Sequence, residues 1–124
     1  MVSGPVWPEI VWPEIEGIDT QDARSRWCND LALFRSVLER WIDDCSDIAV
    51  PPSDSQAVRL HKLRGGACML GAKTIQHVAA QAEAACVAGD VAKAEERTTE
   101  LVTLLRVLRA DAARSFARAE PQLP

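Results

Sequence analysis

Tyrosine is absent from this 124-residue chain, and phenylalanine occurs only twice. Strands favour aromatic and β-branched residues, whereas the alanine, leucine, glutamate and arginine that dominate the second half favour helices. No apolar run is long enough to span a membrane, and the N-terminus lacks the charged segment and apolar stretch of a signal peptide. We therefore expect an all-α domain, located in the cytoplasm and without direct membrane contact.

Patterns that bind metals, nucleotides or nucleic acids are also scarce. The chain has only two histidines, and its four cysteines are about evenly spaced, with no Cys-x-x-Cys pair of the kind that zinc sites use. The segment GGACMLG does not match the phosphate-binding pattern GxxxxGK[ST]. A net charge of −4 argues against nucleic acid as the main partner. We expect reduced thiols in a helical core, no metal or cofactor of the domain's own, and no use of ATP.

The first residues differ from the rest of the chain. The pentapeptide VWPEI occurs twice in tandem, at Val6–Ile10 and Val11–Ile15, and each copy carries a proline, which breaks helices. One interpretation is an extended arm whose Trp7, Trp12 and isoleucines dock onto the domain. The other is a linker from a larger parent protein, and the two are compatible. The expected division is an arm at 1–16, a helical domain at 17–118 and a tail at 119–124.

Apolar residues recur at spacings of three and four through most of the remaining chain, which is typical of amphipathic helices. Capping residues and glycines separate these stretches. Because the connections are short, neighbouring helices should be antiparallel. The prediction is an up-and-down four-helix bundle preceded by a short helix. The expected helices run from Asp19 or Thr20 to about Cys28, from Asn29 or Asp30 through Ile48 to the stop at Pro51 and Pro52, from about Asp54 to Leu70, from Ala72 to Ala88, and from Val91 to about Glu120.

The segment LHKLRGGACMLGA, which starts at Leu60, is the most informative. On a helix, His61 shares a face with Arg64 and Gly65, whereas Leu60 and Leu63 turn toward the core. Arg64 lies one turn beyond His61, so its guanidinium can reach a phosphoryl group on the imidazole. Lys62 points elsewhere and is expected to be solvated.

Two adjacent glycines inside a helix need a physical reason, because each costs about 1 kcal/mol relative to alanine. At Gly65, the missing side chain would let the active site of another protein approach His61. Gly66 lies about 100° further round the helix. It is therefore the better candidate for close packing against a neighbouring helix.

This pattern resembles the histidine-containing phosphotransfer (HPt) domain family of bacterial two-component phosphorelays. The family motif reads His-x-Leu-Lys-Gly, followed by a Gly-Ala or Gly-Leu pair. Arg64 departs from the usual lysine but keeps the charge. The similarity extends from about Glu14 to Ala110. The residues that match the motif are His61, Leu63, Gly65, Gly71 and Ala72.

The resemblance implies a phosphocarrier without a kinase core. It would accept a phosphoryl group on His61 from an aspartyl phosphate of a receiver domain and relay it to another receiver-domain aspartate. The receiver, in a response regulator or a hybrid sensor kinase, would bring its own aspartate and Mg²⁺. It would dock on the exposed face of the second and third helices around His61. The resemblance further implies a monomer.

By the same resemblance, Glu83 belongs to the site, since members often carry Gln or Glu at this point of the following helix. Its carboxylate would accept a hydrogen bond from His61 Nδ1–H and thereby hold the tautomer whose Nε2 has a free lone pair. The alternative for Glu83 is an exposed helical glutamate. The other histidine, His77, has no glycine neighbour, and we interpret it as structural or solvated.

Two other functions compete with phosphotransfer. One is a non-catalytic helical adaptor or degenerate family member that binds a receiver or kinase domain. The other is a small helical enzyme or metal carrier, which the shortage of histidines disfavours. The sequence leaves open the identity of donor and acceptor. It also leaves open whether the domain stands alone or forms the C-terminal module of a membrane-bound hybrid sensor kinase.

Overall fold

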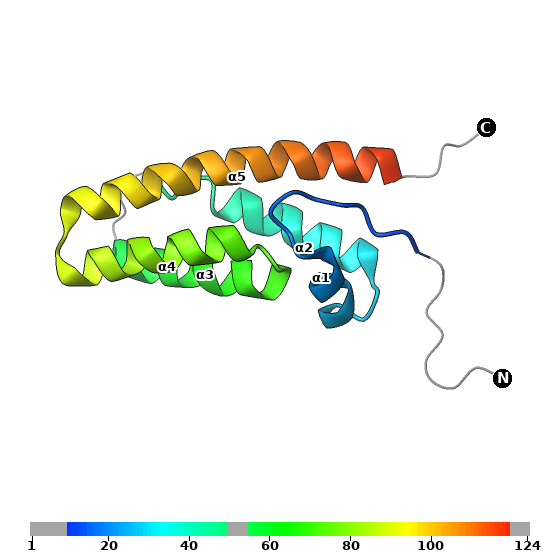
Figure 1. Cartoon of the computed structure of the whole chain (residues 1–124), viewed down its shortest axis with the longest axis horizontal. Helices are drawn as coiled ribbons and strands as arrows, with labels where there is room; N and C mark the ends of the chain where they lie inside the picture. Colours follow the sequence, from blue (N-terminus) through cyan, green and yellow to red (C-terminus); the bar gives the residue numbers. More distant parts are fainter. Residues whose placement is uncertain (1–9, 50–54, 120–124) are drawn as a thin grey trace.

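The computed structural model describes residues 10–49 and 55–119. Within these ranges the protein is all-α, with five helices and no strand, as the composition predicts (Figure 1). The helices are α1 (Thr20–Arg26), α2 (Leu31–Asp44), α3 (Gln56–Leu70), α4 (Lys73–Ala88) and α5 (Val91–Ala119).

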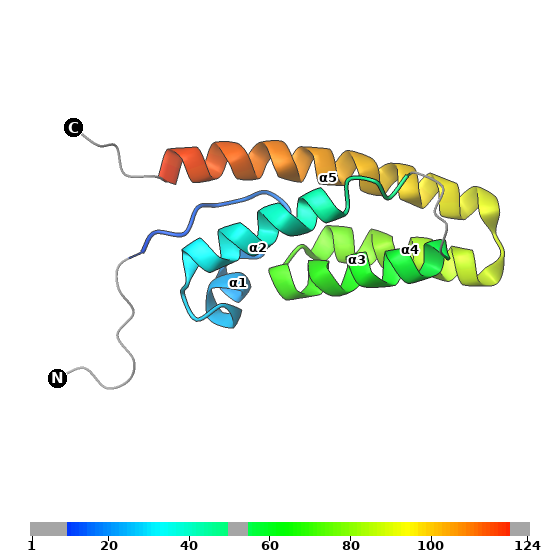
Figure 2. The same ribbon diagram turned by 180° about the vertical axis from the view of Figure 1, so that it is seen from behind.

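Helices α3, α4 and α5 pack side by side as an antiparallel bundle, with α5 extending along its whole length (Figure 1; Figure 2). Helix α2 runs antiparallel to α5. The first part of α2 contacts the C-terminal part of α5, and the end of α2 contacts an earlier part of α5. The Arg35 guanidinium lies 4.9 Å from the centre of the Phe116 ring. At the other end, Asp43 pairs with Arg109 at 2.9 Å. The predicted antiparallel arrangement is therefore confirmed.

Glycine and aspartate set the tight turns on either side of α4. Gly71 and Gly89 end α3 and α4 in the left-handed conformation, with φ of 77° and 74°, which glycine adopts without steric cost. The Asp90 side chain then accepts a hydrogen bond from the Lys93 amide in the first turn of α5. These local signals place both turns where the sequence predicts them.

The prediction that α2 continues through Ile48 is wrong. The helix ends at Asp44, and a series of turns follows through Ala49. Ser46 Oγ donates to the Asp43 carbonyl at 2.8 Å and so satisfies one of the free carbonyls at the helix end. The sequence places acidic residues at this end, including Asp43 and Asp44, where the helix dipole disfavours negative charge. Ile48 is buried all the same, because the turns fold back onto the bundle.

Other boundaries shift by two or fewer residues. Helix α1 ends at Arg26 rather than near Cys28. Helix α3 has Ser55 as its N-cap without a side-chain capping bond. The predicted stop at Pro51 and Pro52 and the start near Asp54 lie outside the described residues, as does the fraying at Glu120.

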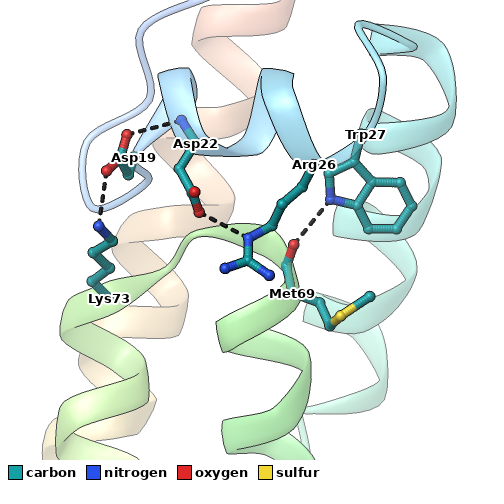
Figure 3. A network of polar contacts seen from close by, with 6 residues as sticks. All are labelled: Asp19, Asp22, Arg26, Trp27, Met69 and Lys73. Carbon is teal, nitrogen blue, oxygen red and sulfur yellow. Dashed lines mark hydrogen bonds and ion pairs between the residues drawn. The ribbon is translucent and has the colours of Figure 1, made fainter.

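Helix α1 is fastened to the turn between α3 and α4 by polar contacts (Figure 3). The Asp19 amide donates to the Gly71 carbonyl at 2.9 Å. The Asp19 carboxylate also accepts from Lys73 at 2.9 Å, and this hydrogen bond lowers the pKa of the Asp19 carboxyl. On the other side, Trp27 Nε1–H donates to the Met69 carbonyl at 2.9 Å. That carbonyl is one of the last four of α3, which have no partner inside the helix.

The second VWPEI copy docks as predicted. Ile15 is buried in the core, and Trp12 packs against Phe34 with ring centres 5.1 Å apart. Trp7 lies outside the described residues. All four cysteines are free thiols, and burial raises the pKa of the Cys45 thiol to about 12. That thiol therefore stays protonated and unreactive at neutral pH.

The backbone of Gly66 lies against the indole of Trp41 on α2. A Cβ built on Gly66 would overlap Trp41 Nε1 and Cδ1, whereas a Cβ on Gly65 meets nothing within 4 Å. The prediction that Gly66 packs closely against a neighbouring helix is therefore confirmed. Trp41 is 9% exposed, so its ring has little room to move aside.

This contrast gives a matched pair of variants. Gly66→Ala should lower the free energy of unfolding by about 1–3 kcal/mol, because overpacking outweighs the gain in helix propensity. Gly65→Ala should raise it by about 0.5–1 kcal/mol, since only the propensity gain applies. Urea denaturation of both variants measures the difference. Equal effects of the two substitutions would contradict the close contact with Trp41.

Candidate functional site around His61

Helix α3 has one side buried in the core and one side exposed to solvent, which we call its bare side. Leu60, Leu63, Ala67 and Leu70 are at most 3% exposed and form the buried stripe. The His61 side chain is 65% exposed. The imidazole therefore stands on the wall of the bundle and is open to another molecule, as predicted.

Apolar side chains flank His61 on the same helix. Val58 and Met69 are 51% and 55% exposed. Although Val58 is apolar, it does not reach the core. Val58 lies one turn before the histidine, on the side of α3 opposite the buried stripe.

Glu83 on α4 faces His61 from across the antiparallel helix pair. Its Oε1 lies 3.0 Å from His61 Nδ1, and its Oε2 lies 3.1 Å from Arg64 Nε. Arg64 Nη2 in turn lies 3.0 Å from His61 Nδ1. The Glu83 side chain is only 21% exposed. The structure thus brings together His61, Arg64 and Glu83, and the reading of Glu83 as an isolated surface glutamate does not fit its contacts.

The two contacts to His61 Nδ1 cannot both be hydrogen bonds. A neutral imidazole nitrogen either donates or accepts. If Nδ1 carries the proton, it donates to Glu83, while Arg64 is satisfied through its Nε. If Nδ1 accepts from Arg64, its lone pair faces a carboxylate oxygen 3.0 Å away, which is repulsive. The first arrangement is therefore favoured, and it leaves a lone pair on Nε2, away from Glu83.

Gly65 leaves open space beside the histidine. Lys62 is exposed and His77 is exposed, with His77 Nε2 3.3 Å from the Gln81 amide. Both fit the expectation of solvated side chains. Over the described ranges, no group of three or more His, Cys, Asp or Glu side chains could hold a metal ion. Similarly, no helix in the described part of the chain is long and apolar enough to cross a membrane.

A helical bundle that presents an exposed imidazole, backed by a carboxylate and close to a glycine, is typical of a phosphocarrier. Comparison with protein families matches the Hpt domain over residues 29–111, about two thirds of the chain. The chain therefore belongs to the Hpt domain family, whose members act in histidine phosphotransfer within phosphorelays and generally interact with receiver domains. The comparison detects no kinase domain. Searches of curated proteins and of solved structures gave no match.

Two residues that support the site were missed by sequence reasoning. Trp27 caps the C-terminal end of α3, and buried Asn29 accepts hydrogen bonds from Trp12 and Arg24 at 2.7 and 3.0 Å. Asn29 has a left-handed backbone with φ of 60°, a conformation in which asparagine is enriched. That enrichment is a signal the sequence carries for Asn29, but no comparable signal exists for Trp27.

The geometry predicts the tautomer of His61. Long-range ¹⁵N–¹H spectra should show Nδ1 protonated and Nε2 unprotonated in the neutral ring, because Glu83 accepts from Nδ1–H. In Glu83→Ala this preference should be lost, while His77 serves as an internal reference. Predominant protonation of Nε2 in the unmodified protein would contradict the arrangement.

Proposed function

We propose that His61 Nε2 accepts a phosphoryl group from the aspartyl phosphate of one receiver domain and passes it to the aspartate of another. The observation that carries this proposal is the exposed imidazole whose Nδ1 lies 3.0 Å from Glu83, which leaves the Nε2 lone pair free. We place this exchange in the cytoplasm, with the domain as a monomer. The chain contributes no metal, and Mg²⁺ belongs to the receiver.

The transfer is a substitution at phosphorus. The Nε2 lone pair forms a bond to phosphorus while the bond to the aspartyl oxygen breaks, and the aspartate leaves as a carboxylate. His61 keeps its proton on Nδ1, so the ring acquires a positive charge as the new bond forms. The reverse sequence on a second receiver returns the neutral imidazole.

Glu83 would act on this charge. Its carboxylate lies against the nitrogen that shares the developing positive charge, and it is held in place by Arg64. A fixed carboxylate that faces a charge formed in the transition state lowers the barrier without reorganising during the reaction. Glu83 therefore both sets the tautomer and stabilises the phosphorylated ring.

Arg64 would act on the phosphoryl group. Its side chain is 37% exposed, so the guanidinium can turn from its contact near the ring toward phosphoryl oxygens. Charge-assisted hydrogen bonds from arginine suit phosphate geometry. Arg64 would thus stabilise the phosphohistidine between the two transfers.

The receiver would dock over the bare side of α3 and the neighbouring face of α2. Gly65 leaves room for the partner's active-site loops, while Val58 and Met69 supply exposed apolar contacts on either side of His61. An interface core of this kind, with few charges, is typical of protein–protein contacts.

The decisive test is a phosphotransfer assay against a panel of phosphorylated receiver domains. The protein should acquire a base-stable, acid-labile phosphate, and His61→Gln should abolish it without a change in helicity by circular dichroism. His77→Gln is the matched control and should label normally. Labelling that persists in His61→Gln would exclude His61 as the acceptor, and no labelling by any receiver would favour a non-catalytic adaptor.

The supporting residues can be separated in the same assay. Glu83→Gln should slow phosphoryl acceptance about tenfold, which corresponds to about 1.4 kcal/mol of lost charge stabilisation. Arg64→Ala should slow transfer by a similar factor, or shorten the phosphohistidine lifetime, whereas Lys62→Ala should do neither. If Arg64→Ala matches Lys62→Ala in both the transfer rate and the phosphohistidine lifetime, Arg64 has no part in the site.

A further inference from the structure

The second VWPEI copy occupies a groove that phosphotransfer does not use. Residues 10–16 run alongside the C-terminal part of α5 and the start of α2 (Figure 2). Ser115 Oγ donates to the Glu14 carbonyl at 2.9 Å, and the Glu16 amide donates to Asp111 at 2.8 Å. Ser115 is buried, so the arm supplies the partner that its hydroxyl needs.

Side chains at three positions of the pentapeptide are bound in this groove. Trp12 packs against Phe34 and donates from Nε1 to buried Asn29 at 2.7 Å. Pro13 is buried, and Ile15 is 3% exposed. The other two side chains face outward: Val11 is 80% exposed, and Glu14 is exposed. The groove therefore recognises a Trp-Pro-x-Ile sequence together with its backbone.

The first copy carries the same residues at each of these positions. Trp7, Pro8 and Ile10 repeat the recognised side chains in the same order. The two polar backbone contacts are available as well, because every residue has a carbonyl and Val11 has an amide where Glu16 has one. The two copies therefore offer the groove the same three side chains and the same two backbone contacts.

We propose that the groove is a binding site for either VWPEI copy and that the arm exchanges between two registers, five residues apart, within one molecule. Exchange in one chain is favoured over docking on a second molecule. A short tether holds the first copy at an effective concentration in the millimolar range, above ordinary solution concentrations of the protein.

The second copy is the preferred occupant. Docking of the first copy would loop out five residues between the groove and α1, and it would break the hydrogen bond from the Ile18 amide to the Ile15 carbonyl, 3.1 Å long. The entropy cost of such a short additional loop is modest. The first copy therefore occupies the groove only as the minor ligand. It becomes the major ligand when a substitution weakens binding of the second copy. This inference is independent of the proposed phosphotransfer.

A double-mutant cycle in the full chain tests the exchange. Trp7→Ala alone should change the melting temperature by less than about 1 °C, because the first copy is the minor occupant. Trp12→Ala should lower it by less than half as much as the double variant Trp7→Ala/Trp12→Ala. In ¹⁵N-labelled Trp12→Ala protein, the indole resonance hydrogen-bonded to Asn29 should reappear from Trp7. Ile10→Ala and Ile15→Ala should form an equivalent cycle.

Val11→Ala is the control, because this exposed position of the docked copy should not change the melting temperature. The proposal is overturned if Trp12→Ala is as destabilising as the double variant, or if it fails to fold. It is also overturned if the rescue depends on protein concentration and sedimentation shows dimers, since the first copy would then dock on a second molecule.

Discussion

The presentation of His61 depends on the contact between the Gly66 backbone and the Trp41 indole. The missing Cβ lets α2 approach α3 closely and fixes how α3 is rotated about its own axis. Residues five apart on a helix lie about 140° from one another, so the side that packs on Trp41 turns His61 away from α2. Among the described residues, the buried Trp41 Nε1 has no hydrogen-bond partner. The indole is therefore positioned by its packing against the Gly66 backbone.

Once α3 is oriented, the turn at Gly71 sets what faces the histidine. A left-handed residue reverses the chain within few residues and brings Glu83 of α4 opposite His61. The carboxylate is largely shielded from water, so its interactions are stronger than those of an exposed pair. One side chain thus contacts both the ring nitrogen and the guanidinium of Arg64. The site is assembled by two adjacent helices, and the long α5 serves to cover their other side.

Local chemistry made the boundaries of α4 and the close packing of Gly66 predictable from sequence, because Gly71 and Gly89 end helices in a left-handed conformation that few other residues adopt. Periodicity could not show that the chain leaves the helix for turns that keep Ile48 buried, so the end of α2 was placed too late. The pairing of His61 with Glu83 came from family resemblance, because the register between antiparallel helices is not contained in the spacing of apolar residues. Trp27 was missed because a side chain that caps another helix leaves no pattern in its own.

The family match begins at Asn29, yet the residues before it complete the site-bearing helix. Trp12 packs on Phe34, Phe34 packs edge-on against Trp27, and Trp27 satisfies a terminal carbonyl of α3. An α3 without this cap would expose that carbonyl and fray from the end nearest Gly71. Because fraying propagates inward from a terminus, the first contacts at risk are those that orient the turn into α4, and with them the position of Glu83. The arm and α1 therefore form one packed unit with the bundle, and the contacts that hold the arm also hold the end of the helix that carries His61.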